Sequence, residues 1–194
     1  MNKKELSNIV SKVENKAKFF KKKSSLDTLS YSEDIIGREK QTEQLVEYLS
    51  GFKQGFVVPL VSIYGRSGSG KSTIARFVCE NLDGVASCFV NLRQAKTVFG
   101  CVNMILGTLG QPNLKSYHGL NMAKEKIKGG ITERLAKEGK SFLVLILDEF
   151  DVLFFDRRSS PSDFIYRLLL VEEELKSKGI MMCVVCISNN VVSN

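Results

Sequence analysis

The chain has 194 residues, of which 43% are hydrophobic and 25% are charged, and its formal net charge is +7. This length allows one domain with a tail, and the composition is that of a globular protein that can bury a sizeable core. No apolar run is long enough to cross a membrane, and no secretory signal opens the sequence. We therefore exclude membrane-spanning and secreted proteins and expect a cytoplasmic location.

The positive charge is concentrated at the start of the chain. Residues 1–23 contain eight lysines and two glutamates, which account for +6 of the net charge of +7. We predict a basic amphipathic helix in a separate N-terminal region, 1–25. Two interpretations stay open: the helix attracts nucleic acid or an anionic surface, or it is a solvated helix that keeps the protein soluble.

Helices and apolar strands alternate through the remaining region, 26–194. The strands are continuous apolar runs, so they indicate an α/β fold with a parallel sheet covered by helices on both faces. We predict strands over 60–64, 85–92, 141–147 and 180–188. We predict helices over 37–49, 71–82, 96–109 and 161–176, and one that follows a loop at 111–119, runs to 137 and breaks at Gly129 and Gly130.

The segment 65–72, GRSGSGKS, has the spacing G-x-x-x-x-G-K-[ST] and lies between a predicted strand and a predicted helix. Glycines here let backbone N–H groups surround a phosphate, and the start of the helix adds positive potential. From a solvent-facing position Lys71 reaches the β- and γ-phosphates, and Ser72 offers its hydroxyl to Mg²⁺. We therefore predict a P-loop NTPase that binds ATP or ADP with Mg²⁺. The predicted nucleotide-binding residues of this segment are Gly65, Arg66, Ser67, Gly68, Ser69, Gly70, Lys71, Ser72 and Thr73.

Two adjacent carboxylates follow the most apolar predicted strand, in the run FLVLILDE at 142–149. We predict that Asp148 holds Mg²⁺ together with Ser72, and that Glu149 polarises the attacking water. A third acid, Asp151, is interpreted as a surface or capping residue.

A polar residue, Asn189, follows the last predicted strand. Because the carboxyl ends of parallel strands face the ligand crevice, we favour a role for Asn189 in orienting the attacking water over an ordinary turn. The predicted catalytic residues are Lys71, Glu149 and Asn189.

The cysteines do not predict a metal site. Cys183 and Cys186 have C-x-x-C spacing, but residues three apart on a strand face opposite sides of the sheet. We expect all five cysteines to be structural thiols, and His118, the only histidine, to carry no metal chemistry.

Several segments, in this order, resemble the AAA+ replication initiators, the archaeal origin-recognition and cell-division-control type ATPases. Many ATPases share the P-loop and the acid pair. The Gly-Arg-Glu box and the Asn-Leu-Arg-Gln sequence at the end of the second strand narrow the resemblance to the replication initiators. The resemblance covers about residues 26–190. The segments that carry it are 34–41 (DIIGREKQ), 63–72 (IYGRSGSGKS), 90–94 (VNLRQ), 147–151 (LDEFD) and 187–189 (ISN).

The resemblance implies further roles and partners. Ile35, Ile36 and Gly37 would line the adenine pocket, and Asn189 would be the first sensor. We expect four parts of the family to lie outside 26–194: the lid, the second-sensor arginine, the arginine finger and the winged-helix domain. The expected fold is therefore an AAA+ core, a three-layer αβα arrangement with a parallel sheet, incomplete at the C-terminus. Without the finger and the lid, we expect very slow ATP hydrolysis. The resemblance implies double-stranded DNA as the partner of the intact family member. A second copy of the chain and other AAA+ subunits are further candidate partners. DNA binding would place the protein at the nucleoid.

The segment 94–130 is where the initiators carry a helical insert that touches DNA. Lys115, Lys124, Lys126 and Lys128 suit this role, but a solvated helix face explains them equally well.

Two other functions remain open. One is a STAND-type signalling ATPase, a nucleotide-dependent switch for protein assembly that shares the Gly-Arg-Glu box. The other is a nucleotide-binding remnant that acts through protein–protein contacts. A salt-sensitive affinity for DNA would favour the initiator over both.

Overall fold

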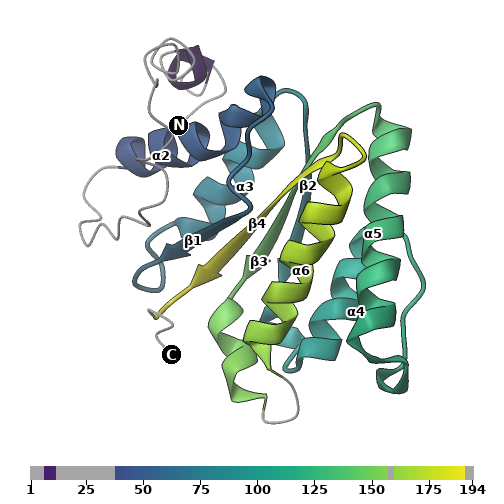
Figure 1. Cartoon of the computed structure of the whole chain (residues 1–194). Coiled ribbons are helices and arrows are strands. Elements are labelled where there is room, and N and C mark those ends of the chain that lie inside the picture. Colours follow the sequence, from purple (N-terminus) through teal and green to yellow (C-terminus); the bar gives the residue numbers. More distant parts are fainter. Residues whose placement is uncertain (1–6, 12–37, 157–159, 191–194) are drawn as a thin grey trace.

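A computed structural model describes residues 7–11, 38–156 and 160–190, and in it helices lie on both faces of a four-stranded sheet (Figure 1). The strand order is β1-β4-β3-β2, and all three neighbouring pairs are parallel. The carboxyl ends of the strands therefore lie at one edge, as the apolar runs predicted. The strands are β1 (Leu60–Tyr64), β2 (Val85–Asn91), β3 (Phe142–Asp148) and β4 (Met181–Ser188).

The helices form two layers around this sheet. One layer holds α2 (Arg38–Ser50) and α3 (Lys71–Asn81). The other holds α4 (Val98–Thr108), α5 (Gly119–Glu138) and α6 (Pro161–Lys176), as Figure 1 shows. Short 3-10 helices join these elements: η2 (Gly51–Gln54), η3 (Leu92–Gln94), η4 (Ser116–His118) and η5 (Phe150–Phe155).

The sheet separates two hydrophobic cores. Every residue of β3 is buried, and its side chains alternate between the core under α2 and α3 and the core under α4, α5 and α6. Cys183 and Cys186 lie in opposite cores, which confirms that these two thiols cannot share a metal. Burial raises the pKa of the Cys186 thiol to about 12, as befits a structural cysteine.

The predicted break in α5 is wrong. The helix runs without interruption through Gly129 and Gly130 because Gly130 serves a helix contact rather than a turn. A Cβ at Gly130 would lie 2.8 Å from Cγ of Gln111 and 3.1 Å from Cβ of Leu109. Packing against the end of α4 therefore requires glycine here, and it outweighs the low helix propensity of glycine.

The N-terminal prediction falls largely outside the described residues. Within 1–25 the structure describes only 7–11, which are helical, and Ile9 packs against the core that contains α2. No described helix has the length and apolarity needed to cross a membrane.

Candidate functional site

The loop between β1 and α3 has the backbone shape that a bound phosphate requires. Gly68 and Gly70 adopt φ angles of 77° and 87°, which L side chains rarely adopt. Gly70 is the N-cap of α3, and no side chain caps that terminus. The first amides of α3 are therefore free to bind an anion. The hydroxyl of Ser69 is buried in the same loop without a hydrogen-bond partner among the described residues, and a phosphate oxygen could accept its hydrogen bond.

Lys71 joins this loop to the end of β4. Its ammonium donates hydrogen bonds to the carbonyl oxygens of Gly65 at 2.7 Å and Arg66 at 2.9 Å, and to Oδ1 of Asn189 at 3.1 Å. The side chain is therefore half-buried and paired, which corrects the prediction that it faces solvent. Two of the three predicted catalytic residues, Lys71 and Asn189, are therefore in direct contact.

The carboxylate of Asp148, at the end of β3, lies against the start of α3. It is only 6% exposed, and its Oδ1 accepts hydrogen bonds from Oγ of Ser72 at 2.8 Å and from the backbone N of Glu149 at 3.0 Å. Its Oδ2 accepts from Nδ2 of Asn91 at 3.2 Å. The hydroxyl and the carboxylate predicted to bind Mg²⁺ are therefore adjacent, although 76 positions separate them in the sequence.

Glu149 begins the segment that leads away from the sheet. Its φ and ψ angles are 55° and 43°, a left-handed conformation that costs a non-glycine residue roughly 1–2 kcal/mol. This turn ends β3 and places Glu149 next to Asp148 at the edge where the strands end. Such strain commonly marks a functional position.

The comparison with known families identifies this arrangement. Residues 34–182 match the model of the family described as AAA ATPase domain. The chain belongs to this family. The match covers most of the described sheet and includes the P-loop and the acid pair, so the AAA+ type of the α/β fold is confirmed.

Among curated proteins, this AAA domain is similar to ORC1-type DNA replication proteins of archaea. It is 32% identical over 152 residues to ORC1-type DNA replication protein 1 of Sulfurisphaera tokodaii, covering 75% of this chain and 36% of the relative. It is 26% identical over 191 residues to the Archaeoglobus fulgidus protein of the same name, covering 94% and 44%. The predicted resemblance to the initiators is confirmed, and the chain spans less than half the length of these relatives.

Solved structures agree on the fold. The Aeropyrum pernix ORC2 protein, described as ADPNP-ADP complexes, matches with a TM-score of 0.63 and 24% identity, covering 88% of this chain and 46% of that one. The Aeropyrum pernix ORC1 protein in complex with DNA matches with a TM-score of 0.61 and 22% identity, covering 82% and 41%.

The structure brings together most of the predicted site residues of the AAA domain. Lys71, Ser72, Asp148 and Asn189 form one connected set, whereas Thr73 is exposed on the first turn of α3. The predicted adenine-pocket residues, Ile35, Ile36 and Gly37, lie outside the described residues.

Sequence reasoning missed Asn91 as a member of this set. The signal was present, because Asn91 is a polar residue one position before the end of the predicted strand 85–92, but it was used only for the family resemblance. Asp151 also differs from its interpretation as a surface or capping residue. Its Oδ1 is buried in η5 without a hydrogen-bond partner among the described residues.

No cluster of three or more His, Cys, Asp or Glu side chains that could hold a metal occurs in the described part of the chain. Mg²⁺ in nucleotide sites commonly binds one or two protein ligands together with substrate phosphates and waters. Ser72 and Asp148, which are in contact, would fit such a ligand set.

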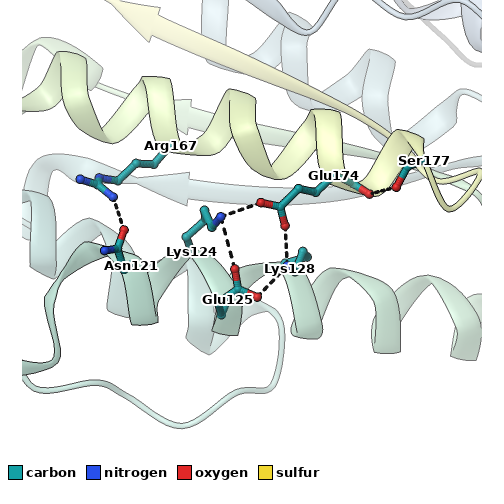
Figure 2. A network of polar contacts seen from close by, with 7 residues as sticks. All are labelled: Asn121, Lys124, Glu125, Lys128, Arg167, Glu174 and Ser177. Atoms are coloured by element: carbon teal, nitrogen blue, oxygen red, sulfur yellow. Dashed lines mark hydrogen bonds and ion pairs between the residues drawn. The ribbon is translucent and has the colours of Figure 1, made fainter.

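Two of the lysines proposed for DNA contact are engaged elsewhere. Figure 2 shows Lys124 and Lys128 of α5 on either side of Glu174 of α6. The Nζ atoms of the two lysines lie 2.6 and 2.5 Å from the two carboxylate oxygens of Glu174. Both lysines also pair with Glu125, at 3.3 and 2.6 Å, which closes a ring of alternating charge. Hydrogen bonds from the lysines lower the pKa of Glu174 to about 2. Lys124 and Lys128 are therefore partly covered and paired with carboxylates, whereas Lys115 and Lys126 are exposed.

Proposed function

We propose that this chain is the ATP-binding module of a DNA replication initiator, in which ATP binding and slow hydrolysis act as a switch. The observation that carries the proposal is the contact between Ser72 and Asp148 beside Lys71, since it joins the phosphate loop to the acid pair. The confirmed family and the ORC1-type relatives support the same function.

Each residue has a defined task in this proposal. The amides of the loop and of the first turn of α3 bind phosphate oxygens, and Lys71 exchanges its carbonyl partners for the β- and γ-phosphates. Ser72 and Asp148 would hold Mg²⁺, which neutralises phosphate charge when it is bound. Glu149 and Asn189 orient and polarise the attacking water from the ends of β3 and β4.

ATP binding and turnover depend on different groups. An arginine finger typically contributes roughly 10³–10⁵ to the rate of phosphoryl transfer, because it neutralises charge that develops only in the transition state. ATP binding does not need this charge, so we expect the P-loop to bind ATP whether or not an arginine finger completes the site.

Double-stranded DNA is the partner that we propose. Its support is the family resemblance, the ORC1-type relatives and the +6 charge of residues 1–23. Because phosphate contacts release counterions, the affinity for duplex DNA should fall steeply as salt is raised. Failure to bind a duplex even at low salt would contradict this part of the proposal.

The nucleotide site is tested by replacing Lys71. Lys71→Ala should weaken binding of fluorescent ATP by at least about 10- to 100-fold, because hydrogen bonds between a charged group and phosphate are lost. Lys140→Ala is a matched control, since Lys140 is also half-buried and donates to a backbone carbonyl, that of Val85, at 3.0 Å. Unchanged ATP affinity in a folded Lys71→Ala variant would sink the assignment.

A further inference from the structure

A hydrogen bond joins the two connecting segments that lie beside the nucleotide site. One joins β2 to α4, and the other contains η5 and follows Glu149. Asp156, at the end of η5, is buried, and its Oδ2 accepts a hydrogen bond at 3.1 Å from the backbone N of Val98, the first residue of α4. This contact joins positions 58 residues apart. A carboxylate is favourable at this place because of the positive potential of a helix N-terminus.

The cap supplied by Asp156 is additional to a local one. Thr97 is the N-cap of α4, and its hydroxyl accepts a hydrogen bond from the backbone N of Gly100 at 2.9 Å. The helix therefore begins with one cap from its own connection and one from the connection that leaves the acid pair. The second comes from the segment that follows Glu149, whereas the first lies on the connection that begins at Asn91, the donor to Asp148.

Both connections are also conformationally constrained. Lys96 and Glu149, with φ angles of 53° and 55°, are the two non-glycine residues with positive φ in the described part of the chain, and each lies on one of the connections. Around Lys96 the backbone is tightly packed, because a Cβ at Gly100 would lie 2.3 Å from the carbonyl oxygen of Ala95. Strained conformations of this kind persist only where the surroundings hold them.

We propose that Asp156 is a positioning residue that links occupancy of the nucleotide site to the order of α4. The inference rests on the proposed nucleotide site. Asp148 and Glu149 would be restricted when phosphate and Mg²⁺ are bound. The six-residue helix η5 would carry that restriction along its length, and Asp156 would pass it to the first amides of α4. Because such coupling is reciprocal, a partner that orders α4 raises the affinity for ATP by the same factor.

Hydrogen exchange of the full chain, with and without ATP–Mg²⁺, tests this link. In the wild type, ATP–Mg²⁺ should increase the protection of the amides at 98–101. Asp156→Ala should abolish that increase and lower the basal protection of the Val98 amide about tenfold, the size expected for one lost cap. Asp156→Asn keeps an acceptor oxygen and should retain most of the increase.

Thr97→Ala is the matched control, because it removes a cap from the same helix while Asp156 stays in place. It should lower basal protection but keep the ATP-dependent increase. A circular dichroism melt shows first that the variants fold. Asp156→Ser, whose hydroxyl is too short to reach Val98, takes the place of the alanine variant if that variant is unfolded.

Three results would overturn the link while leaving the nucleotide site intact, provided that calorimetry shows ATP binding to the wild type. The first is no change in α4 protection in the wild type. The second is an equal increase in the wild type and in Asp156→Ala. The third is the same loss in Thr97→Ala, which would trace the effect to the stability of α4 alone. A wild type that binds no ATP contradicts the proposed function and the link together.

Discussion

Asp148 and Lys71 are held in place by other residues of the site itself. The ammonium of Lys71 contacts three oxygen acceptors, and the carboxylate of Asp148 accepts from three donors. Both were predictable, because glycine spacing and a strand that ends in two acids are local signals. The contact from Asn91 was not predictable, because it depends on the register of β2 against β3, which pairs Asn91 with Asp148.

Asn91 should therefore set the affinity for Mg²⁺. In Asn91→Ala, Oδ2 of Asp148 loses its donor, and a hydrogen bond to a charged group contributes about 1.5–3 kcal/mol. We expect the Mg²⁺ concentration needed for half-maximal ATP binding to rise at least about tenfold. A titration of Mg²⁺ in the presence of fluorescent ATP measures it.

A matched control for this variant exists on α4. The side chain of Asn103 donates a hydrogen bond to the carbonyl oxygen of Leu114 and accepts one from its backbone N, away from the site. Asn103→Ala should reduce stability without changing the Mg²⁺ requirement. An Asn91→Ala variant that responds to Mg²⁺ like the wild type would show that Asp148 needs no support from β2.

At the scale of elements, most helices and strands follow from local patterns, but their contacts do not. The bounds of β1 and α3 agree with prediction to within a residue, since an apolar run and a glycine loop define them. The predicted break in α5 was wrong because the sequence does not show which glycines are needed for contact between helices. In the structure Gly130 packs against Leu109 and Gln111, whereas Gly129 does not.

The two glycines of α5 should respond in opposite directions to alanine. Apart from the neighbouring backbone of its own helix, no atom of the described residues lies within 4 Å of a Cβ at Gly129, so Gly129→Ala should stabilise the protein by about 0.5–1 kcal/mol through helix propensity. At Gly130 the added methyl meets Gln111 and Leu109, and overpacking of this kind costs about 1–3 kcal/mol. Urea unfolding of both variants measures the difference. A Gly130→Ala variant as stable as Gly129→Ala would show that the two helices separate easily.

The ring of charges between α5 and α6 should make stability depend on acid. The hydrogen bonds from Lys124 and Lys128 hold the pKa of Glu174 at about 2, below its ordinary value of 4.5 (Figure 2). Ionised Glu174 therefore stabilises the fold above about pH 4.5, and this contribution is lost as the pH falls toward about 2.

Glu174→Gln should lower the free energy of unfolding at neutral pH, and the gap to the wild type should narrow between about pH 4.5 and pH 2. Urea unfolding at a series of pH values measures this gap. Glu173→Gln, at the exposed neighbouring position, is the control and should leave the profile unchanged. A gap that stays constant down to pH 2 would mean that the ionised form of Glu174 does not stabilise the fold.

At the scale of the whole molecule, the order of the sheet gathers distant residues at one edge. Because β4 lies between β1 and β3, Lys71 meets Asn189 across 118 positions while Ser72 meets Asp148 on the next strand. The parallel sheet was predictable from continuous apolar strands. The engagement of Lys124 and Lys128 with α6 was not, because charge spacing alone does not distinguish a DNA-facing lysine from one that joins two helices.

The central claim is one Mg²⁺-dependent ATP site built by the P-loop and the acid pair. The most direct test is calorimetric titration of ATP, with and without Mg²⁺, into the wild type, Ser72→Ala, Asp148→Asn and the double variant. We predict one site per chain that Mg²⁺ strengthens in the wild type. Each single variant should lose that enhancement, and the double variant should lose no more than either, because both residues serve one metal. Mg²⁺ enhancement that survives in the double variant, or a wild type that binds no ATP, would contradict the account.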